Sequence, residues 1–143
     1  MKLFLSLSCI IPFFCFSQTV VKKTFYPNGS LLSEISYKDG KRDGICKTFW
    51  QNDILFLSVI KTEGNYKNGR MIGQFKSYFQ NGQIESQGTF KYTDSEVYSR
   101  KDGVWKYYYN NGKIQSESII KDGVEKLKFY DKQGNLTPIG NGC

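Results

Sequence analysis

The residues of this chain that could recognise a partner chemically are lysines and tyrosines at fixed places in a repeated motif. In four copies a lysine stands three residues after a glycine, at Lys47, Lys76, Lys106 and Lys126. An aromatic residue follows two positions later in three of the copies, and a β-strand would place it on the same face as the lysine. Such columns can bind phosphate or another acidic group and can stack sugars or bases. The candidate partner-binding residues are therefore Lys76, Tyr78, Lys106 and Tyr108.

The same residues also have a structural interpretation. If Asn111-Gly112 forms the centre of a two-residue type I′ turn, counting outward places Lys106 opposite Glu117. The same counting gives the pairs Lys23–Glu34 and Lys76–Gln87. Opposed charges across a strand pair contribute about 0.2–1 kcal/mol, and an aromatic ring can shield a lysine stem. The sequence leaves the binding and the structural interpretation open.

The chain lacks the residues that several kinds of catalytic site require. The chain has no histidine, which removes Ser-His-Asp and Cys-His nucleophiles and the usual zinc sites. The Asp-Gly pairs at 39, 102 and 122 do not follow the calcium-loop pattern and indicate turns. The separation of paired carboxylates, as in glycoside hydrolysis, is left open by a sequence. We predict a protein that is not an enzyme and has no cofactor.

The repeat unit that positions the lysines is clearest at Gly103–Gly112, GVWKYYYNNG, where alternation and aromatic enrichment indicate a half-buried strand. The turn then places Tyr109 opposite Ile114. Matching copies begin 29 and 30 residues apart, at Gly44, Gly73 and Gly103. A fourth begins at Gly123, 20 residues on, with a longer turn that ends at Gly134. A unit of this period indicates an array of hairpins.

The connections between the copies are predicted from their turn residues. Turns are expected at Tyr37–Lys41, Tyr66–Arg70, Arg100–Gly103 and Lys121–Gly123. The apolar run Ile54–Ile60 is predicted as a buried strand, and no helix of useful length is expected. The connection Tyr92–Ser99 is longer and acidic. Inserted loops are frequent recognition sites and are also tolerated without a role, so both interpretations stay open.

The two ends of the chain differ from the repeats. Residues 1–17 combine Lys2, an apolar run and small residues before Gln18, which predicts a cleaved signal peptide and a periplasmic or extracellular protein. The repeat domain is expected over 18–136 and a tail over 137–143. Cleavage leaves Cys46 and Cys143, which could form a disulfide, although Cys46 also suits a small buried position in a strand.

The motif Gly-x-Trp-Lys-x-Tyr-Tyr-x-Asn-Gly-x-Ile at Gly103–Ile114, preceded by Lys-Asp, resembles the MORN-variant repeat of bacterial proteins, a family often labelled YwqK-type antitoxin. The resemblance covers roughly Phe25–Leu136. It implies an all-β fold of consecutive antiparallel β-hairpins in an elongated, twisted single sheet. It also implies a scaffold for protein or membrane contacts, and the antitoxin label implies neutralisation of a toxin.

The net charge and its distribution along the sequence limit the classes of partner. Loss of Lys2 lowers the formal charge from +7 to +6, and the basic residues alternate with acidic ones instead of forming a cluster. This pattern does not indicate nucleic acid, whereas it permits weak attraction to acidic surfaces. We predict a protein partner held by the sheet face or by Tyr92–Ser99. A cognate toxin, or an anionic lipid or glycan surface, is the alternative.

Export gives the first testable prediction. The protein purified from the envelope fraction should have the intact mass of a chain that begins at Gln18. A mass that begins at Met1 contradicts the signal peptide.

Overall fold

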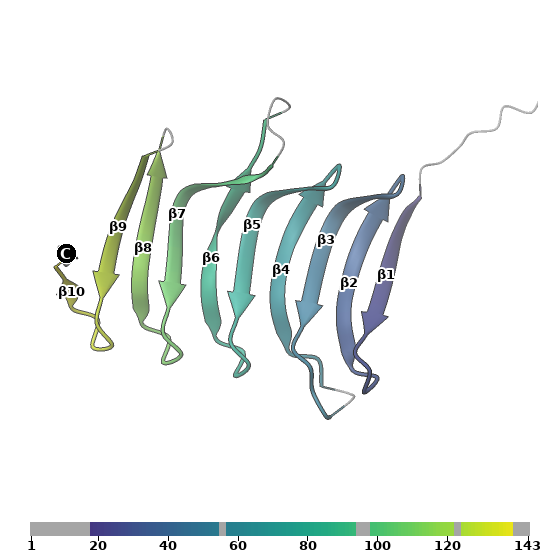
Figure 1. Ribbon diagram of the computed structural model, residues 1–143, viewed down its shortest axis with the longest axis horizontal. Helices are drawn as coiled ribbons and strands as arrows, with labels where there is room; N and C mark the ends of the chain where they lie inside the picture. The colour runs from purple at the N-terminus through teal and green to yellow at the C-terminus, as the bar shows by residue number, and fades with distance from the viewer. Residues whose placement is uncertain (1–17, 55–56, 94–97, 122–123, 139–143) are drawn as a thin grey trace, which may run out of the picture.

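The computed structural model describes residues 18–54, 57–93, 98–121 and 124–138, and these form one antiparallel sheet. Its strands follow one another in chain order, as Figure 1 shows. They are β1 (Thr19–Phe25), β2 (Leu31–Lys38), β3 (Lys41–Phe49), β4 (Ile60–Lys67), β5 (Arg70–Tyr78), β6 (Ile84–Lys91), β7 (Arg100–Tyr108), β8 (Ile114–Lys121), β9 (Val124–Tyr130) and β10 (Leu136–Thr137).

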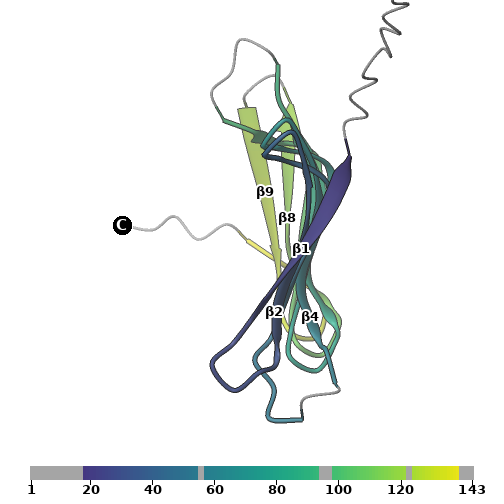
Figure 2. The ribbon, with the colours of Figure 1, turned by 90° about the vertical axis from the view of Figure 1, so that its right-hand side faces the viewer.

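The sheet is an open, twisted single layer. Figure 2 shows it edge-on, with β1 inclined to β9, as the handed twist of strands produces. The described ranges contain no helix, and thus none that could cross a membrane. The predicted all-β array of hairpins is therefore confirmed. The predicted signal peptide and Cys143 lie outside the described residues.

Two classes of turn lie at the two ends of the strands. β2–β3 and β4–β5 are joined by Asp39-Gly40 and Asn68-Gly69, in which both residues have positive φ. This is the type I′ geometry. At the other end Tyr109 N donates to Lys113 O and Gly112 N donates to Tyr109 O, which closes a three-residue loop. A glycine with positive φ ends that loop, as in a type I turn with a G1 bulge.

The predicted type I′ turn at Asn111-Gly112 is therefore wrong, and so is the pair Tyr109–Ile114. Tyr109 faces Lys113, and Ile114 pairs with Tyr108. A bulge at Gln115 then shifts the register by one residue, so that the pairs from Tyr107–Ser116 onward are those predicted. The predicted pair Lys106–Glu117 is therefore confirmed.

The fourth copy also differs from its prediction. Its turn, Asp131–Asn135, has the same hydrogen bonds as the others and is not longer. The difference lies in the strand, because β9 pairs with β8 without the register shift that β3, β5 and β7 show against their preceding strands. Counting from the glycine therefore misplaces the lysine by two residues. Lys128 lies opposite Glu117, and Lys126 lies opposite Ile119.

Two further predicted elements are wrong. Arg100–Gly103 is not a turn, because β7 begins at Arg100 and Gly103 lies within it with a positive φ of 67°. Ile54–Ile60 is not a buried strand. Ile54 and Leu57 are 63% and 53% exposed, residues 55–56 lie outside the described ranges, and β4 begins only at Ile60.

The largest fully buried side chain of the described residues is Trp105, which is 2% exposed and lies on the face opposite Lys106. Its ring lies over Gly88 of β6, and its indole N–H donates to Thr89 O. The rings of Phe75 and Phe90 pack against it with centroids 5.9 Å and 4.9 Å away. Since the sheet is one layer, burial comes from rings that lie flat over a neighbouring strand.

Cys46 occupies the same strand position as Phe75 and Trp105, immediately before the repeat lysine. It is 9% exposed, so the predicted buried position is confirmed. Burial also raises the pKa of its thiol. The predicted disulfide with Cys143 falls outside the described residues.

The aromatic cluster predicts different tolerances at two strand glycines. A Cβ at Gly88 would lie 2.2 Å from Trp105 Cδ2, whereas a Cβ at Gly64 would lie 3.3 Å from Phe75 Cδ2. Gly88→Ala should lower the free energy of unfolding by about 1–3 kcal/mol, the range for overpacking. Gly64→Ala should cost clearly less, because a small shift of the Phe75 ring relieves it. Urea unfolding followed by tryptophan fluorescence measures both, and equal costs would contradict the packing.

Candidate functional site

One row of side chains crosses the sheet and alternates in charge. We call it the charge ladder: Lys23, Glu34, Lys47, Glu63, Lys76, Gln87, Lys106, Glu117 and Lys128, each the register partner of the next. Its ion pairs include Lys23–Glu34, at 2.7 Å, and Lys106–Glu117, at 3.5 Å. Opposed charges at such positions stabilise a sheet.

The ladder has one uncharged member. A glutamate lies between every pair of neighbouring ladder lysines except Lys76 and Lys106, which flank Gln87. These two lysines are two strand spacings apart, about 10 Å. Each of them therefore has a ladder glutamate on one side only, Glu63 for Lys76 and Glu117 for Lys106. The row thus has no acidic member over β6, between the two lysines that the sequence proposed for binding.

The tyrosines of this face contact the ladder from the following strand. Tyr78 donates its hydroxyl to Glu63 Oε1 at 2.6 Å, and Tyr130 donates to Glu117 Oε2 at 2.9 Å. Tyr108 differs, because it accepts from Gln87 Nε2 at 2.6 Å. Its own hydroxyl proton has no acceptor among the described residues and remains available to a ligand.

Burial and hydrogen bonds to glutamates raise the pKa of Tyr78 and Tyr130. Partial burial, followed by the hydrogen bond to Glu63, raises the pKa of Tyr78 to about 12. The hydrogen bond to Glu117 is the main cause that raises the pKa of Tyr130. Both side chains are thus neutral donors at physiological pH, and both are committed to a glutamate of the sheet.

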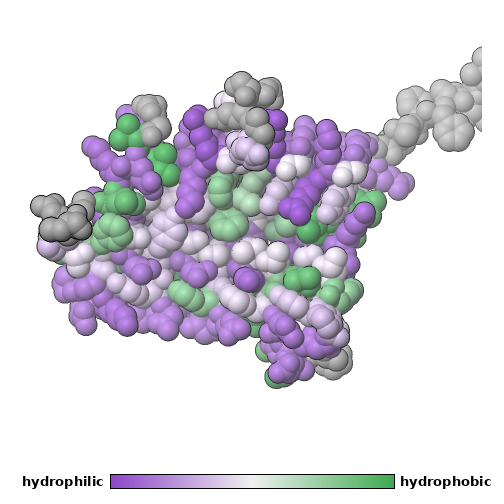
Figure 3. Space-filling view, in the orientation of Figure 1, coloured by the Kyte–Doolittle hydropathy of each residue, from purple (hydrophilic) through white to green (hydrophobic). Residues whose placement is uncertain are grey.

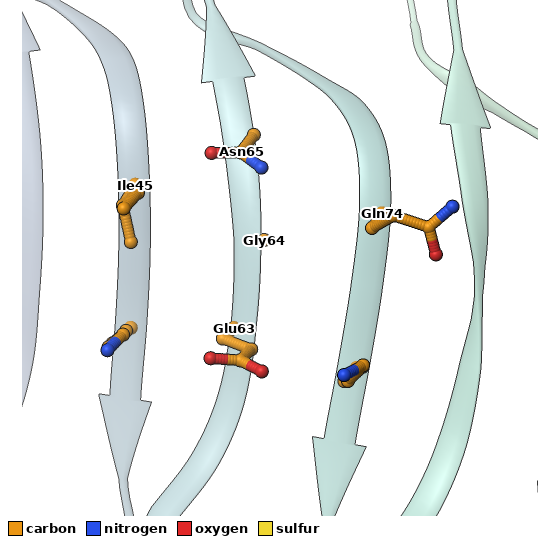
Figure 4. A pocket seen from close by; sticks show the side chains of 7 residues that line it. Ile45, Glu63, Gly64, Asn65 and Gln74 are labelled. Carbon is orange, nitrogen blue, oxygen red and sulfur yellow. The ribbon is translucent and has the colours of Figure 1, made fainter.

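A shallow hollow of about 360 Å³ lies over β3, β4 and β5, one strand away from Gln87. Figure 4 shows Glu63 and Asn65 on its central strand, between Ile45 and Gln74 on the two flanking strands. Lys47 and Lys76 also line it. Two ammonium groups, one carboxylate and two amides suit contact with a polar chain. Within the described residues no group of three or more side chains suited to a metal ion occurs.

The structure thus places Lys76, Lys106 and Tyr108 around Gln87. Tyr78 lies on the same face but contacts Glu63 of β4 instead. The register also adds residues that sequence counting missed, since Glu63 lies between Lys47 and Lys76, and Lys128 ends the row. The sequence does contain a signal for Lys128. Lys128 follows Lys106 by 22 residues, and Tyr130 follows Tyr108 by the same interval. The loop Tyr92–Ser99 contains 94–97, outside the described residues, and its described Tyr92 lies beside Arg70.

Fold and ladder together define a β-hairpin repeat protein. The family model described as the MORN repeat variant matches residues 18–39, 71–92 and 101–122. These matches contain the hairpins β1–β2, β5–β6 and β7–β8, each with a three-residue loop. The resemblance expected from the sequence is confirmed for the repeat, while the match does not extend to the antitoxin label. No curated protein matches the chain.

Tyr78 gives a testable dependence of stability on pH. The unfolded chain ionises Tyr78 near its ordinary pKa of 10.0, and the folded chain only near about 12. The contribution of Tyr78 is therefore complete below pH ~10 and is lost as the pH rises from about 10 to about 12. Tyr78→Phe should remove this part of the slope in urea unfolding. It should also cost about 1 kcal/mol near neutral pH, because one hydrogen bond is lost.

The matched control is Tyr98→Phe, since Tyr98 is 82% exposed. It should keep the alkaline slope of the wild type. An unchanged slope in Tyr78→Phe would contradict the role of burial and of Glu63.

Proposed function

We propose that this chain is an exported, non-enzymatic binding module whose charge-ladder face holds an acidic segment of a protein partner. The observation that carries the proposal is Gln87, which replaces the acid expected between Lys76 and Lys106. A sheet that needed only stability would gain from a glutamate there. With glutamine there, Lys76 and Lys106 have no carboxylate between them, and a ligand can supply one.

The hydrogen bond of Gln87 supports the same conclusion. Tyr78 and Tyr130 donate to ladder glutamates, whereas Tyr108 accepts from the Gln87 amide. A carboxylate placed over Gln87 would accept a hydrogen bond from the Tyr108 hydroxyl and lie between two ammonium groups. Charge-assisted hydrogen bonds of this kind are stronger than neutral ones.

The repeat architecture supports binding over catalysis. The matched family model is a repeat, and the fold displays the ladder along an open face. Residues on this face come from successive hairpins at regular spacing, which suits an extended partner that crosses several strands. Export to the envelope rests on the composition of residues 1–17 and remains part of the proposal.

Two other partners were expected from the sequence and remain alternatives. The formal charge of +6 after cleavage favours an anionic lipid or glycan surface. The antitoxin role of the resembling family requires a toxin, so rescue of cells that express a neighbouring toxic gene would support it.

Gln87→Glu separates binding from folding. The substitution completes the ladder, so it should raise the free energy of unfolding by about 0.2–1 kcal/mol and abolish partner binding. The measurement is affinity capture from envelope extract with residues 18–143, wild type and variant side by side, read by mass spectrometry. A stoichiometric protein that the variant loses supports the proposal.

Lys22→Gln is the control, because Lys22 precedes Lys23 in β1, points to the face opposite the ladder and should retain the partner. Equal capture by wild type and Gln87→Glu contradicts the site. Vesicles of phosphatidylglycerol, compared with phosphatidylcholine, test the lipid alternative. Binding to the anionic vesicles alone, lost at moderate salt, would replace the protein partner with a membrane surface.

A further inference from the structure

In the part of the chain that the structure describes, the outer edge of β9 is paired over two residues only. β10 pairs only with Phe129 and Tyr130 and ends at Thr137. Pro138 follows, and proline has no N–H to continue a ladder of hydrogen bonds. In the described part of the chain, residues 124–128 of β9 therefore have a neighbour on the β8 side alone.

The side chains of this edge are apolar and exposed. Leu127 occupies the place in β9 that Trp105 has in β7, immediately before the ladder lysine. Trp105 is 2% exposed, whereas Leu127, Phe129 and Val124 are 42%, 40% and 61% exposed. Figure 3 shows apolar side chains at this end of the sheet, and further ones over its middle and its other end. Unpaired backbone beside exposed apolar side chains is the template for strand addition.

The charge of Lys128 indicates which side chain an added strand would carry opposite it. The ladder ends at Lys128, whose sole ladder neighbour is Glu117. Glu117 already forms an ion pair with Lys106 and accepts from Tyr130. In the complete hairpins a glutamate or glutamine of the return strand lies opposite the ladder lysine, as Glu34 does for Lys23 and Glu117 for Lys106. An acid opposite Lys128 would extend the same pattern.

The β1 edge of a second copy does not fit this edge. The other edge of the sheet is β1, whose ladder residue is Lys23, so head-to-tail contact would oppose two lysines. Like charges directly opposite one another are destabilising. β1 also runs in the same direction as β9, so the contact would place a parallel pair in an antiparallel sheet.

We propose that residues 124–128 of β9 accept an extended segment of a partner protein as an antiparallel added strand. The segment carries an acidic residue opposite Lys128 and a small residue opposite Leu127. Main-chain hydrogen bonds supply affinity, and these two side chains supply specificity. The edge lies two strands beyond Lys106, so the proposal does not rest on the Gln87 site.

The protein itself supplies the probe. β8 has the sequence Ile114–Lys121, IQSESIIK, and pairs with β7 through Glu117 opposite Lys106 and Ser118 opposite Trp105. A fluorescein-labelled peptide of this sequence should bind residues 18–143 at low salt, measured by fluorescence anisotropy. Hydrogen exchange should show new protection at residues 124–128 and none in β1.

A charge swap tests the pairing. Lys128→Glu should weaken the peptide by about fivefold to tenfold, as expected when an attractive pair becomes a repulsive one. A peptide with Glu117→Lys should bind the wild type weakly and bind Lys128→Glu with restored affinity. Lys128 is exposed, so the variant should fold, and the fluorescence of Trp105 checks that it does.

Gln87→Glu should bind the peptide as the wild type does, so failure of the Gln87 site and of this edge can be told apart. No detectable binding at millimolar peptide, protection of β1 instead of β9, or absence of rescue in the charge swap would each overturn the proposal. Concentration-dependent dimers in sedimentation, with protection of β9, would overturn the choice of occupant in favour of a second copy.

Discussion

The described residues form one layer of sheet, and this constraint governs the rest of the structure. A two-layer protein buries apolar side chains between its layers. Here each large side chain must find contacts within the plane of the sheet. The Trp105 ring lies over Gly88, and Phe75 approaches Gly64. On the opposite face the tyrosines lean onto the charge ladder, so both faces are stabilised by contacts between neighbouring strands.

The same constraint connects stability with binding. In a single layer, a cross-strand ion pair helps to fix the register and also lies on the surface that a partner would meet. A residue that completes the ladder therefore stabilises the sheet and neutralises the surface together. Gln87 separates these two effects, because its amide keeps a hydrogen bond to Tyr108 while placing no carboxylate between Lys76 and Lys106. At position 87 a glutamate would favour the stability of the sheet, whereas the glutamine favours the proposed binding.

Sequence periodicity was sufficient for the strands of the repeats and for the pairs Lys23–Glu34, Lys76–Gln87 and Lys106–Glu117. The pairing predicted from periodicity was wrong where a β-bulge shifts the register by one residue. Asn-Gly suits both a two-residue type I′ turn and the end of a three-residue loop, and the two differ by one residue in the pairing. The count at Lys106 was right because the Gln115 bulge compensates for that residue. The count at Lys126 was wrong because β9 lacks the shift of its counterparts.

The candidate site was partly accessible for the same reason. Lysine and tyrosine columns follow from period two, which the sequence displays directly. Glu63 was missed because the long connection before β4 hides its place in the repeat. The free proton of Tyr108 depends on which atom of Gln87 faces it, a geometric fact with no signature in residue spacing.

The number of strands in the ladder has a consequence of its own. Nine strands contribute, and residues of opposite type alternate, so the odd count gives both outer edges the same sign. Adding or removing a whole hairpin preserves this parity. One further complete strand would give a sheet with a cation at one edge and an acid at the other. Such a molecule would be complementary to itself and could grow into a polymer. With an odd number of ladder strands, the described sheet instead has a lysine in the ladder at both outer ends, and like charges oppose head-to-tail growth.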